Sequence, residues 1–480
     1  MIIKSDKDTI SPYLTDQSGL NGSYCERVFV PENYSEVSDV LKYAFQNSLP
    51  VTVSGSGTGV TGGRLPFGGI VISLEKLNKI ISFDNEYLVV QAGVPLSEIH
   101  SFLKKRNRIY PPDSTEWSAS IGGNIATNAS GSRTFKYGPT RKYVKELKIA
   151  LPNGDILDIP RGEFVAKGSW FETPFLPPFE IANYKMPDIK NAAGYYSQKN
   201  MDLIDLFIGS EGTLSVILEA KLKTLYFNGQ LLSFFVFFDD YSQVLDFVAK
   251  ARKQNLLSIE FFDENSLILV RKNFSQIPKN KKAAVFFEEE ILDKTPDAVE
   301  KAIGKWSEIL SKFNIDDKYI WAAVEEDKEE EFKKIRHEVP VQVNEIVKLR
   351  KIPKVGTDIA VPEENFNEMF SYYLQLFASE KIDYLIFGHI GDCHLHANIL
   401  PKNIEEMKTA KEIYLKLVKK AILLNGTVSA EHGIGKLKHQ FLKEMYGEDG
   451  LKEMVRIKKI FDEKGILNRD NIFPKEYLDK

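Results

Sequence analysis

Three of the seven histidines of the chain lie close together, at His389, His394 and His396 in the segment GHIGDCHLHAN. The alternation of a β-strand over CHLHANIL puts His394, His396 and Asn398 on one face. His389 precedes a Gly-Asp turn and can fold back onto the same site. Imidazoles gathered in this way bind a divalent metal ion or serve as hydrogen-bonded structural residues.

A fourth histidine, His432, directly follows Glu431 in the segment SAEHGIG. Two imidazoles plus one carboxylate leave open positions on a metal ion, which is typical of catalytic rather than structural sites. A histidine also suits proton abstraction, because its pKa lies near neutrality. Cys393 takes the opposite strand face, so we expect it to be a buried small residue and not a ligand.

A second kind of chemistry is indicated by the segment VTVSGSGTGVTGGRLPFGGIVISL, residues 51–74. Gly57, Gly59 and Gly62 match the G-x-G-x-x-G pattern of nicotinamide sites. That site requires a helix that begins within the glycines and receives the pyrophosphate at its N-terminus. Pro66 and the β-branched run after it argue against such a helix, so a nicotinamide dehydrogenase is disfavoured.

The glycines of this loop are better explained as a backbone cradle for an anion. Successive N–H groups, with serine and threonine hydroxyls between them, form an anion-binding nest; a flexible connection is the alternative. Residues 110–141 and 206–220 form two further glycine-rich segments with the same character. Three loops bounded by strands indicate one long, phosphate-bearing ligand.

The elements that position these loops are read from hydrophobic periodicity. Up to about residue 225, short strands alternate with helices, including an amphipathic helix at 35–48 with Ser35 as its cap and another near 96–107. A β-α-β-β-α alternation follows, which predicts an antiparallel sheet backed by helices. Its expected members are strand 231–238, helix 241–255, strand 256–263, strand 282–292 and helix 297–314. Two more strands are expected within 381–400 and helices at 404–425 and 447–464, and the acidic run 325–331 is expected to be a solvated helix face.

Composition limits the class of protein. The 480 residues carry 63 basic and 67 acidic side chains, a net charge of -4, which does not favour nucleic acid as a partner. No apolar run approaches the ~18 residues of a membrane span, and residues 1–16 show no apolar h-region, so we do not expect secretion. With only two cysteines, a reducing compartment fits. We expect a cytoplasmic protein, and a peripheral association with the membrane stays open.

The three glycine-rich loops carry a family resemblance. GSGTGVTGG, YPPD…SIGGNIATNASG…KYGPTR and GSEGTLSVI resemble the flavin-binding segments of the vanillyl-alcohol oxidase and p-cresol methylhydroxylase superfamily. The most similar branch contains D-lactate dehydrogenase, the glycolate oxidase catalytic subunit and D-2-hydroxyglutarate dehydrogenase. The resemblance implies an α+β fold with a two-lobed FAD-binding domain at 1–226. A substrate or cap domain with an antiparallel sheet and the metal site is implied at 227–435, and a C-terminal helical segment at 436–480 that returns to the FAD domain.

The resemblance also implies FAD as cofactor. The bond to FAD is expected to be non-covalent, because covalent members carry a histidine in or near the first loop and this loop has none. The implied FAD contacts are Gly55, Ser56, Gly57, Thr58, Gly59, Val60, Thr61, Gly62, Pro112, Asp113, Ser114, Gly122, Gly123, Asn124, Ala126, Thr127, Asn128, Glu211, Gly212 and Ile217.

For the histidine cluster, the patterns HxGDxxxH and EHG resemble the metal site of the same branch. The resemblance makes His389, His396 and Glu431 the ligands of a divalent ion, Zn or Mn, and makes His432 the general base. His394 departs from the pattern, since relatives often carry asparagine there. It is a further candidate ligand or a substrate contact.

Arg336, in FKKIRHEVP, matches the arginine that binds the substrate carboxylate in this branch; a surface salt bridge is the alternative. Some relatives place a lysine where this chain has Gly356, with Lys354 nearby, so a second substrate carboxylate has weaker support. Arg64 replaces a small residue of the relatives, and reaching the active site or pairing with an acid are equal alternatives.

The implied reaction is oxidation of a D-2-hydroxy acid, lactate or glycolate first, to the 2-oxo acid by metal-assisted proton abstraction and hydride transfer to flavin N5. Alternatives are D-2-hydroxyglutarate as substrate and a redox-neutral enzyme similar to alkylglycerone-phosphate synthase. A non-catalytic flavoprotein subunit is disfavoured by the histidines. The electron acceptor is expected to be a quinone, a cytochrome, electron-transferring flavoprotein or oxygen, because the sequence shows no haem C-x-x-C-H motif and no iron–sulfur cysteine set. A homodimer is compatible with the sequence.

Overall fold

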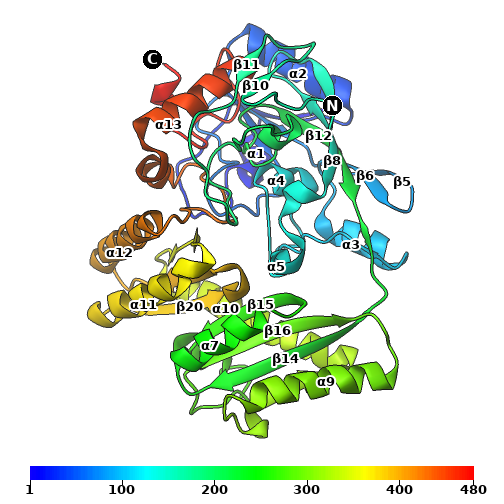
Figure 1. The fold of residues 1–480 in the computed structure, drawn as a ribbon. Helices are drawn as coiled ribbons and strands as arrows, with labels where there is room; N and C mark the ends of the chain where they lie inside the picture. The colour runs from blue at the N-terminus through cyan, green and yellow to red at the C-terminus, as the bar shows by residue number, and fades with distance from the viewer. Residues whose placement is uncertain (480) are drawn as a thin grey trace. The chain divides into compact units, whose positions relative to one another are not determined.

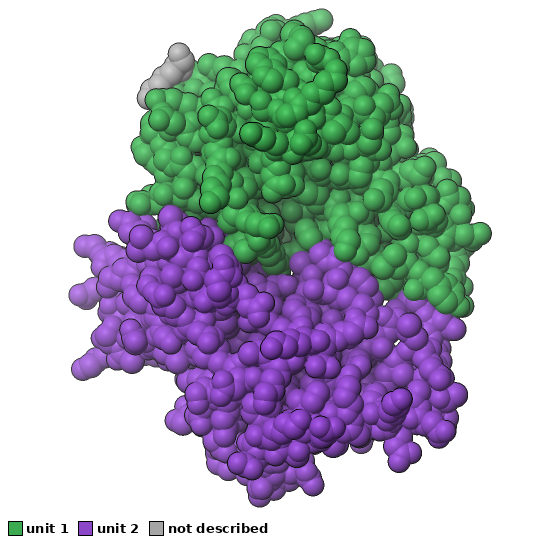
Figure 2. Space-filling view, in the orientation of Figure 1, with its two compact units in different colours: residues 1–130, 139–226, 428–480 green, residues 131–138, 227–427 purple. Residues whose placement is uncertain are grey.

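Two units make up residues 1–479, the part of the chain that the computed structural model describes (Figure 2). Unit 1 combines Met1–Ser130, Pro139–Tyr226 and the chain from Val428 onward, and unit 2 combines Gly131–Gly138 and Phe227–Thr427. Unit 1 is therefore assembled from segments far apart in sequence. The domain limits 1–226, 227–435 and 436–480 stay predictions. The two units group residues by their contacts, and this grouping does not test which segments fold separately.

Unit 1 contains two main sheets. The first has the order β1-β2-β4-β3, with β1 antiparallel and the others parallel. The second is antiparallel, with the order β5-β6-β12-β8-β9. Their bounds are β1 Ile2–Lys4, β2 Arg27–Val30, β3 Val51–Ser54, β4 Ile70–Ser73, β5 Ile80–Phe83, β6 Tyr87–Gln91, β8 Val144–Ala150, β9 Ile156–Pro160 and β12 Val216–Lys223.

Helix α2 (Tyr34–Gln46) joins the parallel strands β2 and β3 and buries Val37, Val40 and Leu41. Its cap differs from the prediction: the side chain of Asn33, not Ser35, accepts the N–H of Glu36. Asparagine and serine are comparable caps, so the position at which the chain leaves its extended conformation decides between them. Helix α3 (Leu96–Lys104) lies where a helix was expected.

No helix begins in the glycine run, which continues from β3 through residues 55–69 into β4. The expectation that excluded a nicotinamide site is thus confirmed. The segment 110–141, predicted as a loop, contains helices α4 (Ile121–Ala126) and α5 (Thr134–Tyr137). Burial of Ile121 and Ile125 on one side of α4 outweighs the low helix propensity of its two glycines.

The C-terminal segment of unit 1 runs beside β3. The N–H of Val51 donates to Ile466 O, and the N–H of Val53 donates to the side chain of Asn468. Helix α13 (His439–Phe461) precedes this segment and begins earlier than the predicted 447–464. Gly447 interrupts α13 with a φ of 71°, which explains why periodicity alone located only its second half.

Unit 2 is built on one antiparallel sheet of eight strands, as the β-α-β-β-α pattern predicts. Its order is β17-β14-β16-β15-β20-β21-β18, with β19 also paired to β21. The bounds are β14 Gln230–Phe238, β15 Leu256–Asp263, β16 Ala283–Ile291, β17 Ile320–Ala323, β18 Val355–Gly356, β19 Ile359–Ala360, β20 Tyr384–Gly388 and β21 His394–Ile399. Strand β15 occupies the predicted residues.

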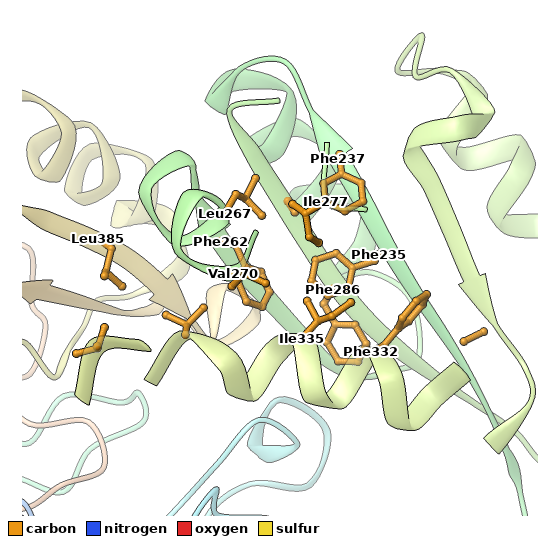
Figure 3. Close-up of a cluster of buried hydrophobic side chains, with 14 of the residues drawn as sticks. Phe235, Phe237, Phe262, Leu267, Val270, Ile277, Phe286, Phe332, Ile335 and Leu385 are labelled. Atoms are coloured by element: carbon orange, nitrogen blue, oxygen red, sulfur yellow. The ribbon is translucent and has the colours of Figure 1, made fainter. Parts of the chain in front are cut away.

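Helices cover both faces of this sheet, and the phenylalanines of β14 alternate between them. Phe235 and Phe237 pack with α10 residues such as Phe332 (Figure 3), whereas Phe234 packs on the other side against Trp306 of α9. The helices are α7 Tyr241–Ala251, α8 Glu264–Val270, α9 Pro296–Ser311, α10 Glu326–Arg350, α11 Glu363–Ser379 and α12 Ile404–Leu423 (Figure 1). Within residues 1–479, none of the helices has the length and apolar character needed to cross a bilayer.

Candidate functional site

A large pocket lies within unit 1. It encloses about 980 Å³ of space, open solvent included. All of its lining residues belong to unit 1, and apart from Ala92 they come from the three glycine-rich segments and from the C-terminal part of the unit, from Val428 onward. The pocket therefore assembles the loops that the sequence predicted to share one ligand.

Fourteen of the twenty residues predicted to contact FAD line this pocket. They are Gly55, Ser56, Gly57, Thr58, Gly59, Thr61, Gly122, Gly123, Asn124, Ala126, Thr127, Glu211, Gly212 and Ile217. The other six, which do not line it, are Val60, Gly62, Pro112, Asp113, Ser114 and Asn128. As contacts to FAD, all twenty stay predictions.

Several lining residues were missed by the sequence analysis. The C-terminal Asn468 and Asn471 line the pocket, and their side-chain amides both donate to the carbonyl of Glu211, at 2.7 and 3.1 Å. No motif distinguishes these asparagines from others in the sequence.

Arg64 also lines the pocket; its Nη1 donates to Gly55 O and its Nη2 to Pro12 O.

The pocket fits a flavin nucleotide in two respects. Gly57 has a φ of 81°, which lets the backbone approach a ligand where a side chain would be strained. The hydroxyl of Ser215 is buried, lines the pocket and has no hydrogen-bond partner among residues 1–479. A buried hydroxyl without a partner is costly, so a polar ligand at this position would relieve that cost.

Glu211 connects the pocket to the loop that carries His432. Its carboxylate accepts the backbone N–H groups of Ile434 at 2.6 Å and Gly435 at 2.7 Å. Burial raises the pKa of Glu211 to about 7, against the opposing effect of these two donors. Glu211 is thus a support of the loop as well as a pocket residue.

His432 itself lines the pocket. The preceding residue, Glu431, is held by neighbours of unit 1: its Oε2 lies 2.9 Å from Lys190 Nζ and accepts Ser130 Oγ at 3.1 Å. His432 Nε2 lies 4.0 Å from Glu431 Oε1. The predicted base therefore lies at the wall of the pocket formed by the predicted flavin loops.

In unit 2, the three clustered histidines do come together. The ring centroids of His394 and His396 are 4.4 Å apart, and that of His389 is 5.5 Å from each. One ring nitrogen of each lies within 4.8 Å of those of the other two. His394 and His396 share a strand face, as alternation predicts, and His389 directly follows β20 and caps the short helical turn Ile390–Asp392.

Each histidine has a ring nitrogen close to an oxygen of unit 2. His389 Nδ1 lies 2.6 Å from Glu260 Oε1, and His396 Nδ1 lies 3.2 Å from Thr357 O. His394 Nε2 lies 3.1 Å from Asp358 Oδ1, with both side chains fully buried. Partners of this kind orient imidazoles in metal sites, so this donor set fits a divalent ion.

The backbone around the cluster is adapted to it. Gly388 has a φ of 122°, and a Cβ there would lie 2.9 Å from His396 Cδ2, so only glycine leaves room for that ring. Cys393 is buried and its sulfur lies 3.0 Å from Arg252 Nη2. Burial raises the pKa of the Cys393 thiol to about 12. The cysteine is thus a buried thiol held by Arg252, as expected for a residue that is not a ligand.

Arg336 projects from α10 towards the same end of the sheet. Its Nε and Nη2 lie 3.1 and 3.0 Å from Glu260 Oε2. The salt bridge that was its alternative reading is therefore present, but with a buried strand residue and not on the surface. Its contact with a substrate carboxylate stays a prediction. Lys354 directly precedes β18 (Val355–Gly356), two residues before Gly356.

Family models identify both parts of the chain. Residues 25–160 match the FAD binding domain, and residues 232–472 match the C-terminal domain of FAD linked oxidases. The second match alone covers half of the chain. The chain belongs to the FAD-linked oxidase family. It is an FAD-dependent oxidoreductase, which agrees with the resemblance derived from its loops.

Relatives of this FAD-linked oxidase match over nearly its whole length. The chain is 30% identical to glycolate oxidase subunit GlcD of Bacillus subtilis, over 97% of this chain and 92% of that protein. It is 29% identical to D-lactate dehydrogenase of Anaerostipes hadrus, over 95% and 91%. It is 28% identical to D-2-hydroxyglutarate dehydrogenase of Xanthomonas citri, over 93% and 89%.

Among solved structures, the FAD-linked oxidase is similar to an alkyldihydroxyacetonephosphate synthase. The TM-score is 0.64 at 15% identity, covering 97% of this chain and 81% of that one. At this identity the likeness shows the fold alone. It confirms the predicted α+β class with an FAD-binding part of the p-cresol methylhydroxylase type.

Proposed function

We propose that this FAD-linked oxidase oxidises a D-2-hydroxy acid, lactate or glycolate first, to the 2-oxo acid. The observation that carries the proposal is the position of His432 on the wall of the pocket lined by the flavin loops. A base at that position is within reach of a substrate lying against the flavin. The names of the relatives, D-lactate dehydrogenase and glycolate oxidase, support the same substrate class.

In the proposed reaction, His432 accepts the proton of the substrate hydroxyl. FAD supplies the hydride acceptor at N5 of its flavin ring. Glu211 keeps the base in place, since its carboxylate holds the N–H groups two and three residues beyond His432. Loss of the proton from the hydroxyl oxygen and of a hydride from the carbon that bears it converts the 2-hydroxy acid into the 2-oxo acid.

We further propose that His389, His396 and Glu431 hold a divalent ion, Zn or Mn. Such an ion lowers the pKa of a hydroxyl bound to it. The support within unit 2 is the pair of Nδ1 contacts to Glu260 and Thr357. Glu431 belongs to unit 1, so its part rests on the EHG pattern. His394, with its Nε2 directed at Asp358, is a weaker candidate ligand.

Arg336 is proposed to bind the substrate carboxylate. Glu260 takes the Nε and Nη2 edge of the guanidinium, so the substrate would approach Nη1, which lies 3.2 Å from His337 Nε2. D-2-hydroxyglutarate remains a second candidate substrate, because one relative carries that name. Lys354 is the cation nearest in sequence to Gly356, where the second carboxylate would need a partner.

Anaerobic bleaching of the bound flavin tests the proposal. The purified yellow protein is mixed with a panel of D- and L-2-hydroxy acids, with and without a chelator. We expect bleaching by D-lactate or by glycolate, and suppression by the chelator. A flavin that stays oxidised with every member of the panel would instead favour redox-neutral chemistry like that of the alkylglycerone-phosphate synthases.

A further inference from the structure

Glu260 is a carboxylate placed where the sequence predicts a buried strand. It lies in β15 among apolar neighbours, and its side chain is 4 % exposed. Oε1 lies 2.6 Å from His389 Nδ1, and Oε2 lies 3.0 Å from Arg336 Nη2. The two oxygens of one carboxylate are thus divided between two side chains to which the proposed function gives different tasks.

This arrangement opposes the usual effect of burial. The guanidinium of Arg336 lies 3.0 Å from Oε2 and offsets the cost of burying a charge. The other oxygen, Oε1, faces His389 Nδ1 at 2.6 Å. An ionised oxygen at Nδ1 favours the tautomer that carries its proton on Nδ1 and its lone pair on Nε2.

A second glutamate is as deeply buried as Glu260 but has different partners. Glu288 lies on β16, next to β15, and its side chain is also 4 % exposed. It too faces an arginine, with Oε1 lying 3.3 Å from Arg133 Nη2, and its Oε2 accepts Ser258 Oγ at 2.9 Å. Glu288 therefore provides a buried, arginine-paired carboxylate whose partners here are Arg133 and Ser258.

We propose that Glu260 is a positioning residue that sets two parts of the site at once. It holds His389 in the orientation and tautomer needed for metal ligation, and it holds Arg336 in the orientation needed for the substrate carboxylate. This inference rests on the proposed function for the tasks of His389 and Arg336. What it adds is the coupling of His389 and Arg336 through one carboxylate.

Glu260→Gln separates the two contacts. An amide has one acceptor oxygen and one NH2 group, so it cannot accept from His389 and Arg336 with the two atoms that a carboxylate offers. One partner must face a donor. Glu288→Gln is the matched control, because it removes a carboxylate of equal burial from the neighbouring strand of the same sheet.

The first measurement is the affinity of the FAD-loaded protein for Zn²⁺, by competition with a chelator. We expect Glu260→Gln to weaken binding about 10- to 100-fold, as for other residues that orient metal ligands, and Glu288→Gln to leave it unchanged. In a His389→Ala background, Glu260→Gln should have no further effect, because the ligand that it orients is gone. Equal losses in both backgrounds, or from both glutamates, would show a general structural effect and overturn the proposal.

The second measurement does not depend on metal or substrate. In protein labelled with ¹⁵N at its seven histidines, long-range ¹H–¹⁵N spectra report the tautomer of His389. We expect a proton on Nδ1 in the native protein and its loss or redistribution in Glu260→Gln. Glu260→Asp, which keeps the charge but shortens the side chain, serves if the amide variant does not fold; an unchanged Nδ1 signal in the folded variant would overturn the proposal.

Steady-state kinetics complete the test. Loss of orientation at Arg336 should raise the KM for the hydroxy acid in Glu260→Gln, while loss at His389 should lower kcat. If none of the 2-hydroxy acids bleaches the flavin of the wild-type protein, the proposed function is contradicted. The tautomer experiment would still decide the role of Glu260. The two failures are therefore distinguishable.

Discussion

The carboxylate of Glu211 accepts the backbone N–H of Gly435 at 2.7 Å, three residues beyond the proposed base. Glu211 comes from the third glycine-rich loop, whereas Gly435 belongs to the C-terminal part of unit 1. One buried carboxylate therefore joins the cofactor pocket to the loop of His432. This contact gives Glu211 a measurable effect on stability.

Glu211→Gln should change the pH dependence of stability. The folded pKa of Glu211, about 7, lies above the ordinary value of 4.5. Its protonation therefore favours the folded state below about pH 4.5, and that contribution is lost as pH rises towards 7. The loss amounts to about 3 kcal/mol by linkage. We expect the melting temperature of the wild type, relative to Glu211→Gln, to fall between pH 5 and pH 7.5.

Comparison with the variant is essential for this measurement, because Asp263 also has its pKa raised to about 7 by burial. Asp263 contributes equally to both proteins, so the difference between them isolates Glu211. A difference that is independent of pH would contradict the assigned protonation of this carboxyl group.

His432→Ala should abolish bleaching of the flavin by substrate without releasing FAD. His432 lines the pocket as one of many residues, so its loss removes the base but little of the binding surface. General-base removal typically costs 10²- to 10⁴-fold in rate, which stopped-flow absorbance would detect. His100→Ala is the control, since His100 packs against Trp117 and does not line the pocket; normal bleaching in His432→Ala would reject the role.

Gly435→Ala should be more destabilising than Gly168→Ala. Both glycines have a positive φ, 52° and 65°, and an alanine there costs about 1–2 kcal/mol in the left-handed region. A Cβ at Gly435 would also lie 2.2 Å from Thr61 O, whereas nothing lies within 4 Å at Gly168.

Because Thr61 lines the pocket, Gly435→Ala should additionally weaken FAD binding, and Gly168→Ala should not. Thermal unfolding and quenching of FAD fluorescence measure the two effects separately. Equal losses of stability from both substitutions would mean that the loop moves to accommodate the methyl group.

Removal of the metal ligands should leave FAD bound but prevent turnover. We expect His389→Ala and His396→Ala to lower affinity for Zn²⁺ or Mn²⁺ by more than about 100-fold, beyond the cost of losing an orienting partner. Elemental analysis of the purified proteins checks this, with His337→Ala as a histidine outside the cluster. Retention of stoichiometric metal by both variants would exclude these ligands.

Much of the secondary structure was predictable because local patterns and burial agree. Strand β15 matched its prediction, since a run of apolar residues bounded by polar ones is what a buried strand requires. Helix α4 was not predicted, because two glycines within it lower local helix propensity and only tertiary burial of Ile121 and Ile125 offsets this. The cap at Asn33 and the first half of α13 were missed for comparable, local reasons.

The candidate site divides in the same way. The glycine loops and the histidines can be recognised from residue type and spacing. In the structure, the loops line one pocket and the three histidines form one cluster. Glu260, Asn468 and Asn471 have no motif, because their role depends on which strands become neighbours. The one available signal was an acidic residue in the middle of the apolar strand LLSIEFFD, since a buried charge requires a partner.

The participation of Asn468 and Asn471 in the pocket has a consequence for biosynthesis. The glycine loop at 55–63 leaves the ribosome more than 400 residues before these asparagines, and the whole of Phe227–Thr427 is made in between. A growing chain therefore holds an incomplete cradle until Asn468 and Asn471 have been made. Cofactor loading should then follow translation, and chains that stop early should emerge colourless.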